Sequence, residues 1–348
     1  SLVDAFAVQG RSTLGGNVTS TSDQTYAGAV TLTTGTTLDA GAGRISLAGV
    51  AGGGFDLTLK STASGTQAIT TSASLTQIAT LDVQGGATLG GNVTTTGNQT
   101  YSSTVTLDGQ AVTLQAAGRL SVAGAIEGDG QNLTLISGSG ASDAIVLGAA
   151  VNHVADLLVQ GAAQLGGDVT TTGTQHYTSL VTLTGDTTFT ASGLSVLGDL
   201  DVASHNLGIY SDAFNVVGSI LNPGSQASVA GSLASTTIGV AGGTGTLQLT
   251  QALMDKFSGF GTLTVGRVDG SGTITFGDFT LTRNLGVQTG SGQIELGALD
   301  GAYRFTATSD TGTVRFNGVV GGTTALSGLT VNADARINTS QKIGRAHV

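Results

Sequence analysis

The sequence predicts an all-β fold, a single-stranded parallel β-helix of roughly sixteen coils with about 21 residues in each coil. Three observations support this prediction: a phrase that recurs at a fixed period, short runs of alternating apolar and polar residues, and a composition rich in Gly and almost free of Pro. Self-similarity at a fixed period is typical of stacked units that cannot bury a core alone.

The recurring phrase is LGGNVT at residues 14–19 and 89–94, and LGGDVT at residues 165–170. Each copy follows a VQG and precedes a Gln-x-Tyr and a VTL, and all four landmarks keep one spacing of about 75 residues. The landmark residues are Val8, Val83 and Val159 in VQG, Tyr26, Tyr101 and Tyr177 with Gln24, Gln99 and Gln175 in Gln-x-Tyr, and Val30, Val105 and Val181 in VTL. We expect like residues to stack, with the VQG valines at one corner of a continuous spiral.

Alternating runs of four to six residues between Gly, Asn, Asp and Ser indicate short strands, each with one buried face. Similar runs return at intervals of about 20–25 residues. Glycine pairs such as Gly90 and Gly91 are expected at the turns, where only small residues fit. Threonine runs such as residues 94–96 are expected to face solvent on strands. The chain contains only one Pro, as expected, because proline lacks the backbone N–H that a central strand donates to its neighbour.

Three divisions follow along the chain. Residues 1–220 hold three super-repeats of about 75 residues, and residues 221–341 continue the β-helix with coils of a different repeat type. The lone Pro223 stands where the first repeat pattern fails. Residues 342–348 read KIGRAHV, which matches a translated sequencing adapter, and are excluded from the fold prediction.

One short helix is expected at residues 250–257, inserted between coils. Thr250 is its expected N-cap, and Leu253, Met254 and Phe257 follow at helical spacing without glycine or β-branched residues between them.

Both the LGGNVTTTGNQTY-type repeat and the later segment IGVAGGTGTLQLTQALMDKFSGFGTLTVGRVDGSGTITFG resemble the β-strand repeats of filamentous haemagglutinin-like bacterial exoproteins. These are adhesins exported by two-partner secretion or related routes. The resemblance covers nearly all of residues 6–340 and implies a right-handed parallel β-helix that is exported and displayed at the cell surface. It also implies a structural shaft, with host or neighbouring-cell glycans or proteins bound by regions outside this segment.

Composition narrows the classes of partner. A net charge of −10 and a pI near 4.5 argue against nucleic acid and anionic membranes, because no basic patch is present to neutralise phosphates. No run approaches 18 apolar residues, so no membrane-inserted helix is expected. The chain has no Cys, which excludes disulfides and thiolate metal sites. We expect a monomeric rod.

No catalytic, cofactor-binding or metal-binding residue is predicted. His176 replaces the Thr found at residues 25 and 100, which indicates drift at a solvent-facing position, and His153 has no triad spacing around it. The most ligand-like cluster is Asp199, Asp201 and His205 in GDLDVASH. Two carboxylates are too few for Ca²⁺, which takes six to eight oxygens, and a solvated strand end is the preferred interpretation.

Two other functions remain as alternatives to an adhesin shaft. A polysaccharide lyase or hydrolase would need carboxylates paired across coils, and Glu295, Asp300 and Asp310 with Arg304 are the candidates for convergence. An ice-binding solenoid would need an unbroken threonine array, whereas TTT runs occur once per super-repeat and not once per coil. The three repeated tyrosines are expected to close a coil by packing over a turn.

Overall fold

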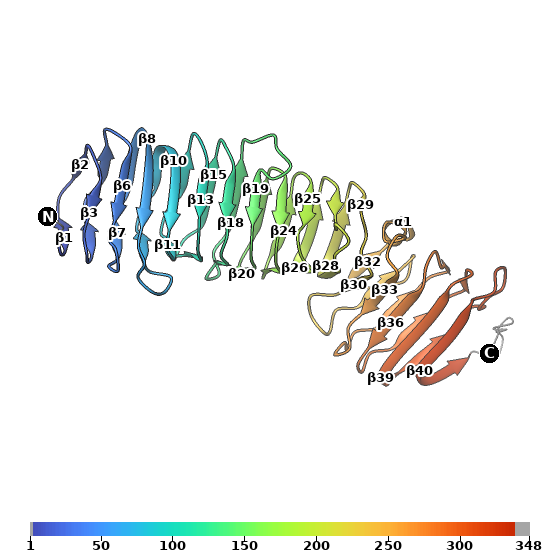
Figure 1. Ribbon diagram of the computed structural model, residues 1–348. Coiled ribbons are helices and arrows are strands. Elements are labelled where there is room, and N and C mark those ends of the chain that lie inside the picture. Colours follow the sequence, from blue (N-terminus) through green and yellow to red (C-terminus); the bar gives the residue numbers. More distant parts are fainter. Residues whose placement is uncertain (1–2, 338–348) are drawn as a thin grey trace. The chain divides into compact units, whose positions relative to one another are not determined.

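The structure, a computed structural model, describes residues 3–337 and is an all-β parallel β-solenoid of about 17 turns with one short helix (Figure 1). This confirms the predicted fold class. The suspected adapter tail, residues 342–348, lies outside the described residues. Contacts divide the chain into two units, the first ending at Thr182 and the second beginning at Leu183. The division near residue 220, where the repeat type changes, stays a prediction.

Three parallel ladders, here called faces A, B and C, build the first unit, and each turn contributes one strand segment to each face (Figure 1). Face A contains β1 (Phe6–Val8), β4 (Gln24–Tyr26), β7 (Ile45–Leu47), β9 (Ile69–Thr71), β11 (Ala87–Leu89), β14 (Val105–Leu107), β17 (Ile126–Glu127), β20 (Val151–Val154) and β23 (Val169–Thr171). Face B contains β2 (Ser12–Leu14), β5 (Val30–Leu32), the first parts of β8 (Val50–Lys60) and β10 (Leu75–Gln84), β12 (Val93–Thr95), β15 (Val112–Ala116), β18 (Leu133–Ser137), β21 (Leu157–Gln160) and β24 (Thr174–Tyr177).

Face C contains β3 (Val18–Thr19), β6 (Thr36–Asp39), the second parts of β8 and β10, β13 (Gln99–Tyr101), β16 (Leu120–Val122), β19 (Ile145–Leu147) and β22 (Ala163–Leu165). Strand β25 (Val181–Leu183) contains the division between the units. Along most strands, buried residues alternate with more exposed ones, as in Val30–Leu32, because successive side chains point to opposite sides. The apolar side chains of the three faces meet inside and form the core.

The three super-repeats are turned relative to one another around the solenoid. Tyr26 lies on face A, Tyr101 on face C and Tyr177 on face B. One super-repeat contributes eleven strand segments: seven from β1 to β7, two from β8, one from β9 and one from the first part of β10. Since three segments make a turn, the repeat spans three and two-thirds turns, and each copy starts on a different face.

The prediction that the VQG valines share one corner is therefore wrong. Each of them pairs in register with the tyrosine of its own repeat on the next turn, and the three pairs lie on three different faces: Val8 with Tyr26, Val83 with Tyr101, and Val159 with Tyr177. The local register recurs in every repeat, but like residues of successive repeats do not stack. The super-repeat therefore repeats the order of the strand segments, but its length is not a whole number of turns.

Threonine runs are not uniformly solvent-facing, which corrects the expectation for residues 94–96. Thr95 is buried, and its Oγ1 donates to Gly97 O at 2.9 Å. Thr171 at the equivalent position is also buried and donates to Gly173 O at 3.1 Å. Period-2 alternation places the middle and outer residues of such a run on opposite sides, so one threonine enters the core and satisfies its hydroxyl locally.

Gly90 and Gly91 lie at a turn, as predicted, and the reason is close approach of the backbone. A Cβ on Gly90 would lie 2.8 Å from Thr71 O, and one on Gly91 would lie 2.5 Å from the Ala73 carbonyl carbon. These atoms belong to the turn below, so any larger residue would push two coils apart.

The second unit contains two long parallel ladders, which share β39 and β40. The first runs through β26 (Thr187–Val196), β28 (Leu207–Val216), β30 (Gln226–Ala230), β33 (Thr262–Gly266), β36 (Leu285–Thr289), β39 (Arg304–Phe316) and β40 (Gly328–Ile337). The other runs through β31 (Ile238–Val240), β34 (Ile274–Phe276), β37 (Ile294–Leu296) and the second parts of β39 and β40. Shorter pairs are β27 (Leu200–Asp201) with β29 (Ile220–Leu221), β31 with β32 (Leu247–Leu249), and β35 (Phe279–Thr280) with β38 (Leu299–Asp300).

Helix α1 (Gln251–Asp255) confirms the predicted helical insertion. The N-cap is Thr250, whose Oγ1 accepts a hydrogen bond from Leu253 N at 3.2 Å. Met254 and the following Phe257 are buried, and the Phe257 ring lies 6.1 Å from that of Phe214. The helix therefore closes over the core of the second unit.

Candidate functional site

Acidic and amide side chains of the described residues stand mostly at turns, where their Oδ1 atoms accept backbone N–H groups of the next turn. Asp156 accepts Thr174 N at 2.7 Å and Thr174 Oγ1 at 2.9 Å, and Asn98 accepts Arg119 N at 2.9 Å. The same kind of bond recurs for Asn17, Asp23, Asp56, Asn92, Asn132, Asp186, Asp199, Asn206, Asp212, Asp278, Asn284 and Asp300. Many carboxylates that produce the negative net charge thus link coils.

The repeated Gln-x-Tyr forms a polar pair inside the core. The Tyr101 hydroxyl donates to Gln99 Oε1 at 3.2 Å, and both side chains are at most 1% exposed. Gln99 Nε2 donates to Val93 O at 3.2 Å and to Gln115 O. The same tyrosine-to-glutamine bond, at 3.3 Å, joins Tyr26 to Gln24 and Tyr177 to Gln175. The tyrosines therefore lie within the core, which corrects the expectation that they pack over a turn.

Burial raises the pKa of the Tyr26 phenol to about 12, and burial raises the pKa of Tyr101 and Tyr177 still further. Each phenol stays protonated and acts as a hydrogen-bond donor within its coil. These groups are structural.

Among the histidines of residues 3–337, His153 lies beside a carboxylate and an amide. His153 lies in β20, which pairs with β17 of the preceding turn on face A. Its Nδ1 lies 3.1 Å from Glu127 Oε2, and Asn152 Nδ2 donates to Glu127 Oε1 at 2.9 Å. The imidazole is 79% exposed. Thr106 occupies the position below Glu127 in the same ladder. The arrangement orients a histidine with a carboxylate at the surface, and it supplies no hydrogen-bonded nucleophile to activate.

Asp199, Asp201 and His205 do not form one cluster. Asp199 accepts Ser219 N, Asp201 accepts Ala203 N and Asn222 Nδ2, and His205 Nδ1 lies 3.7 Å from Asp186. The pKa of Asp186 is lowered, first by the backbone hydrogen bond from Asn206. No group of three metal-ligating side chains occurs within residues 3–337. His176 pairs in register with Leu158 on face B and holds the position of Thr25 and Thr100 in the other repeats.

The four residues proposed for a polysaccharide-processing enzyme take separate contacts. Glu295 Oε1 lies 3.9 Å from Arg315 Nη1 on the next turn, and Asp300 accepts Thr323 N and Thr324 N at 2.9 and 3.0 Å. The backbone N of Arg304 donates to Asn284 Oδ1. Asp310 lines a large groove.

That groove has a volume of about 670 Å³ and crosses β36, β39 and β40 of the second unit. Its lining residues are Val268, Gln288, Thr289, Thr308, Ser309, Asp310, Asn332, Ala333 and Asp334. Two carboxylates, Asp310 and Asp334, stand beside neutral hydroxyl and amide groups. A groove of this kind can form hydrogen bonds to a polar polymer.

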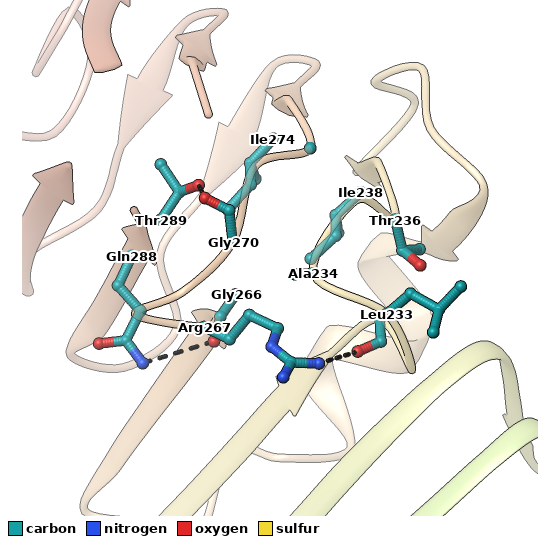
Figure 2. A pocket seen from close by; sticks show the side chains of 12 residues that line it. Leu233, Ala234, Thr236, Ile238, Gly266, Arg267, Gly270, Ile274, Gln288 and Thr289 are labelled. Atoms are coloured by element: carbon teal, nitrogen blue, oxygen red, sulfur yellow. Dashed lines mark hydrogen bonds between the residues drawn. The ribbon is translucent and has the colours of Figure 1, made fainter. Parts of the chain in front are cut away.

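A second hollow in this unit lies between the turn after β30 and the turn after β33 (Figure 2). Gln288 Nε2 donates to Gly266 O at 3.4 Å, and Thr289 Oγ1 donates to Gly270 O at 2.8 Å (Figure 2). The Arg267 guanidinium bonds Asp269 and the Ser232 carbonyl, and lies 5.6 Å from the Tyr210 ring. The cavity measures about 10 Å³, room for about one water molecule, so it is too small for an organic ligand.

Two features escaped the sequence analysis. The first is the burial of the hydrogen-bonded Gln and Tyr side chains. It has a signal in the sequence, since Gln24 and Tyr26 are two residues apart and so share one side of a strand. The burial of Arg283 has no signal in the sequence, because a single charged residue in a turn is typical of the surface.

No helix among the described residues is long and apolar enough to cross a bilayer. Comparison of the chain with protein-family models, curated proteins and solved structures gives no match.

Proposed function

We propose that this chain is a structural shaft segment of a large secreted bacterial surface adhesin, which carries binding regions elsewhere in the same protein. The observation that supports this proposal most is the continuous series of parallel pairings from turn to turn through the first unit, with register shifts only in the pairings of β10 and β20, and with polar groups at the turns that connect one coil to the next. Each coil contacts its neighbours, so stability is close to a sum of coil and interface contributions. Such a shaft is extended by adding repeats.

The surface chemistry agrees with that role. Exposed positions carry mainly Thr, Ala, Gly and Ser, and many of the acidic residues at the turns accept backbone N–H groups. Walls of this kind expose few apolar side chains for non-specific lateral association. The negative net charge adds mutual repulsion between copies.

A surface-display experiment tests the shaft role. The full chain is inserted between an outer-membrane anchor and an epitope tag on a non-adherent bacterium, and antibody access and protease resistance are measured on intact cells. We expect an accessible tag and a protease-resistant chain. The proposal is contradicted if the chain is degraded at the surface, or if the purified chain releases reducing or unsaturated sugar ends from a panel of polysaccharides.

Ice binding is a second candidate because the structure contains a hydroxyl column that the sequence argument did not anticipate. On face A, Thr25, Ser46, Thr70, Thr88 and Thr106 are paired in register over five successive turns. Thr88 is buried, however, and its Oγ1 donates to Thr66 O at 2.9 Å, so a loop covers the column at that turn. A thermal-hysteresis measurement separates the two functions: ice binding requires a concentration-dependent freezing gap, and a shaft segment shows none.

A further inference from the structure

Arg283 is a buried charge with an incomplete set of partners. Its side chain lies in the turn between β35 and β36 and is 6% exposed. Nη2 donates to Met254 O, in the last turn of α1, at 2.7 Å and to Thr282 Oγ1 at 3.1 Å. Nε and Nη1 are buried and have no hydrogen-bond partner among residues 3–337. Two nitrogens of the charged guanidinium, Nε and Nη1, thus lack a hydrogen-bond acceptor beside the helix.

Protein charges compensate this guanidinium only in part. Burial lowers the pKa of Arg283 to about 10, and the carboxylate of Asp255 acts against that shift. The group therefore stays cationic at neutral pH. Asp255 is exposed, its Oδ1 accepts Gln251 Nε2 at 2.9 Å, and no ion pair between Arg283 and a carboxylate occurs in the described part of the chain. A buried cation without a close counter-charge is costly.

A small cavity adjoins this side chain. It is lined by Arg283, Thr282 and apolar side chains that include Met254 and Phe279, and its volume is about 10 Å³. That volume holds about one water-sized sphere, so it excludes sulfate, phosphate and carboxylate ligands. A halide ion is only slightly larger than a water molecule, can accept hydrogen bonds from both nitrogens and supplies the missing charge, whereas water supplies only the hydrogen bonds.

We propose that Arg283 binds a monatomic anion, chloride under ordinary conditions, through Nε and Nη1 in this cavity. The guanidinium that holds the anion also donates to Met254 O of α1. Anion binding therefore fixes the side chain on which the helix depends. Anion binding then stabilises the inserted helix and the coils on which it packs.

Thermal unfolding of the full chain tests the site. Sodium chloride is titrated against sodium gluconate at constant ionic strength, since gluconate is too large to enter. We expect a saturable rise in the unfolding midpoint with chloride only, and at a chloride concentration 100 times Kd the unfolding equilibrium constant falls about 100-fold. Arg283→Met removes the chloride-specific rise. Arg315→Met, a matched change at a half-exposed arginine paired with Glu295, retains it.

Crystals of the unaltered chain soaked in sodium bromide provide a readout that does not depend on a variant folding. An anomalous bromide peak within hydrogen-bond distance of Arg283 Nε and Nη1 supports the site. Identical midpoints in chloride and gluconate, with an ordered water and no bromide peak beside Arg283, overturn the proposal.

Discussion

Gln99 stabilises its coil through bonds that no solvent molecule can replace in the core. Substitution by Met retains the approximate volume but leaves the Tyr101 hydroxyl and two backbone carbonyls without their partner. We expect Gln99→Met to lower the free energy of unfolding by about 2–3 kcal/mol, measured by urea denaturation. The neighbouring exposed Thr100→Ala is the control and should stay within about 0.5 kcal/mol of the unaltered chain. Equal effects of the two changes would show that the buried pair adds nothing.

The buried phenols make stability depend on alkaline pH. Since burial raises the pKa of Tyr26 to about 12, its contribution to stability is fully present below the unfolded value of about 10. That contribution is lost as the pH rises from about 10 toward 12. We expect tyrosinate absorbance from the repeated tyrosines to appear together with the loss of the β-sheet circular dichroism signal. Ionisation of all tyrosines near pH 10 with the fold intact would contradict their burial.

Asp156 tests whether the carboxylates at the turns act as hydrogen-bond acceptors and not as charges. Asp156→Ala removes the acceptor of Thr174 N and Thr174 Oγ1, and we expect a loss of about 1–2 kcal/mol in the free energy of unfolding. Asp156→Asn keeps an acceptor oxygen and should recover most of that loss. If Asn is as damaging as Ala in urea denaturation, the charge itself is what matters.

At the scale of elements, the regular recurrence of short strands and the capped helix were predictable from local signals. Alternation in Val30–Leu32 and the Thr250 cap each depend on neighbours in sequence. The burial of Gln99 beside Tyr101 was not predictable from hydropathy, because each polar group is acceptable in the core only when the other is present. The buried Arg283 similarly depends on α1, which is distant from it in sequence.

Super-repeats are interchangeable elements if each supplies the same eleven strand segments. Deletion of residues 83–158 joins Asp82 to Val159 and removes one repeat in phase, so the segments that follow find the same kind of pairing surface. We expect a folded chain whose circular dichroism per residue is unchanged and whose melting midpoint shifts by only a few degrees. A deletion of residues 83–148, which breaks the phase, is the control and should lose cooperative unfolding. Equal behaviour of the two deletions would contradict the role of the repeat.

At the scale of the whole molecule, the sequence predicted a solenoid but not how its repeats are arranged around it. The spacing between super-repeats is compatible with three, four or a fractional number of turns, because coils in the first unit differ in length. Phe6 pairs one turn onward with Gln24, whereas the longer coil that begins at Ile126 returns to its ladder only at Val151. Only the register decides between these arrangements, and it gives three and two-thirds turns. Any surface feature of the repeat is therefore presented on all three faces in succession, which suits a shaft that has no single binding side.

The most direct test of this arrangement is disulfide formation between engineered cysteines, since the chain has none of its own. Residues 70 and 88 pair on adjacent turns of face A, a separation of about 4.8 Å that a disulfide can span. We expect Thr70→Cys with Thr88→Cys to cross-link under mild oxidation, and Thr70→Cys with Thr100→Cys to remain reduced. If the repeat spanned three whole turns, so that Thr100 lay in the column of Thr25, Thr100 would directly follow Thr70 in that column. Cross-linking of residues 70 and 100, with none between 70 and 88, would contradict the rotated repeats.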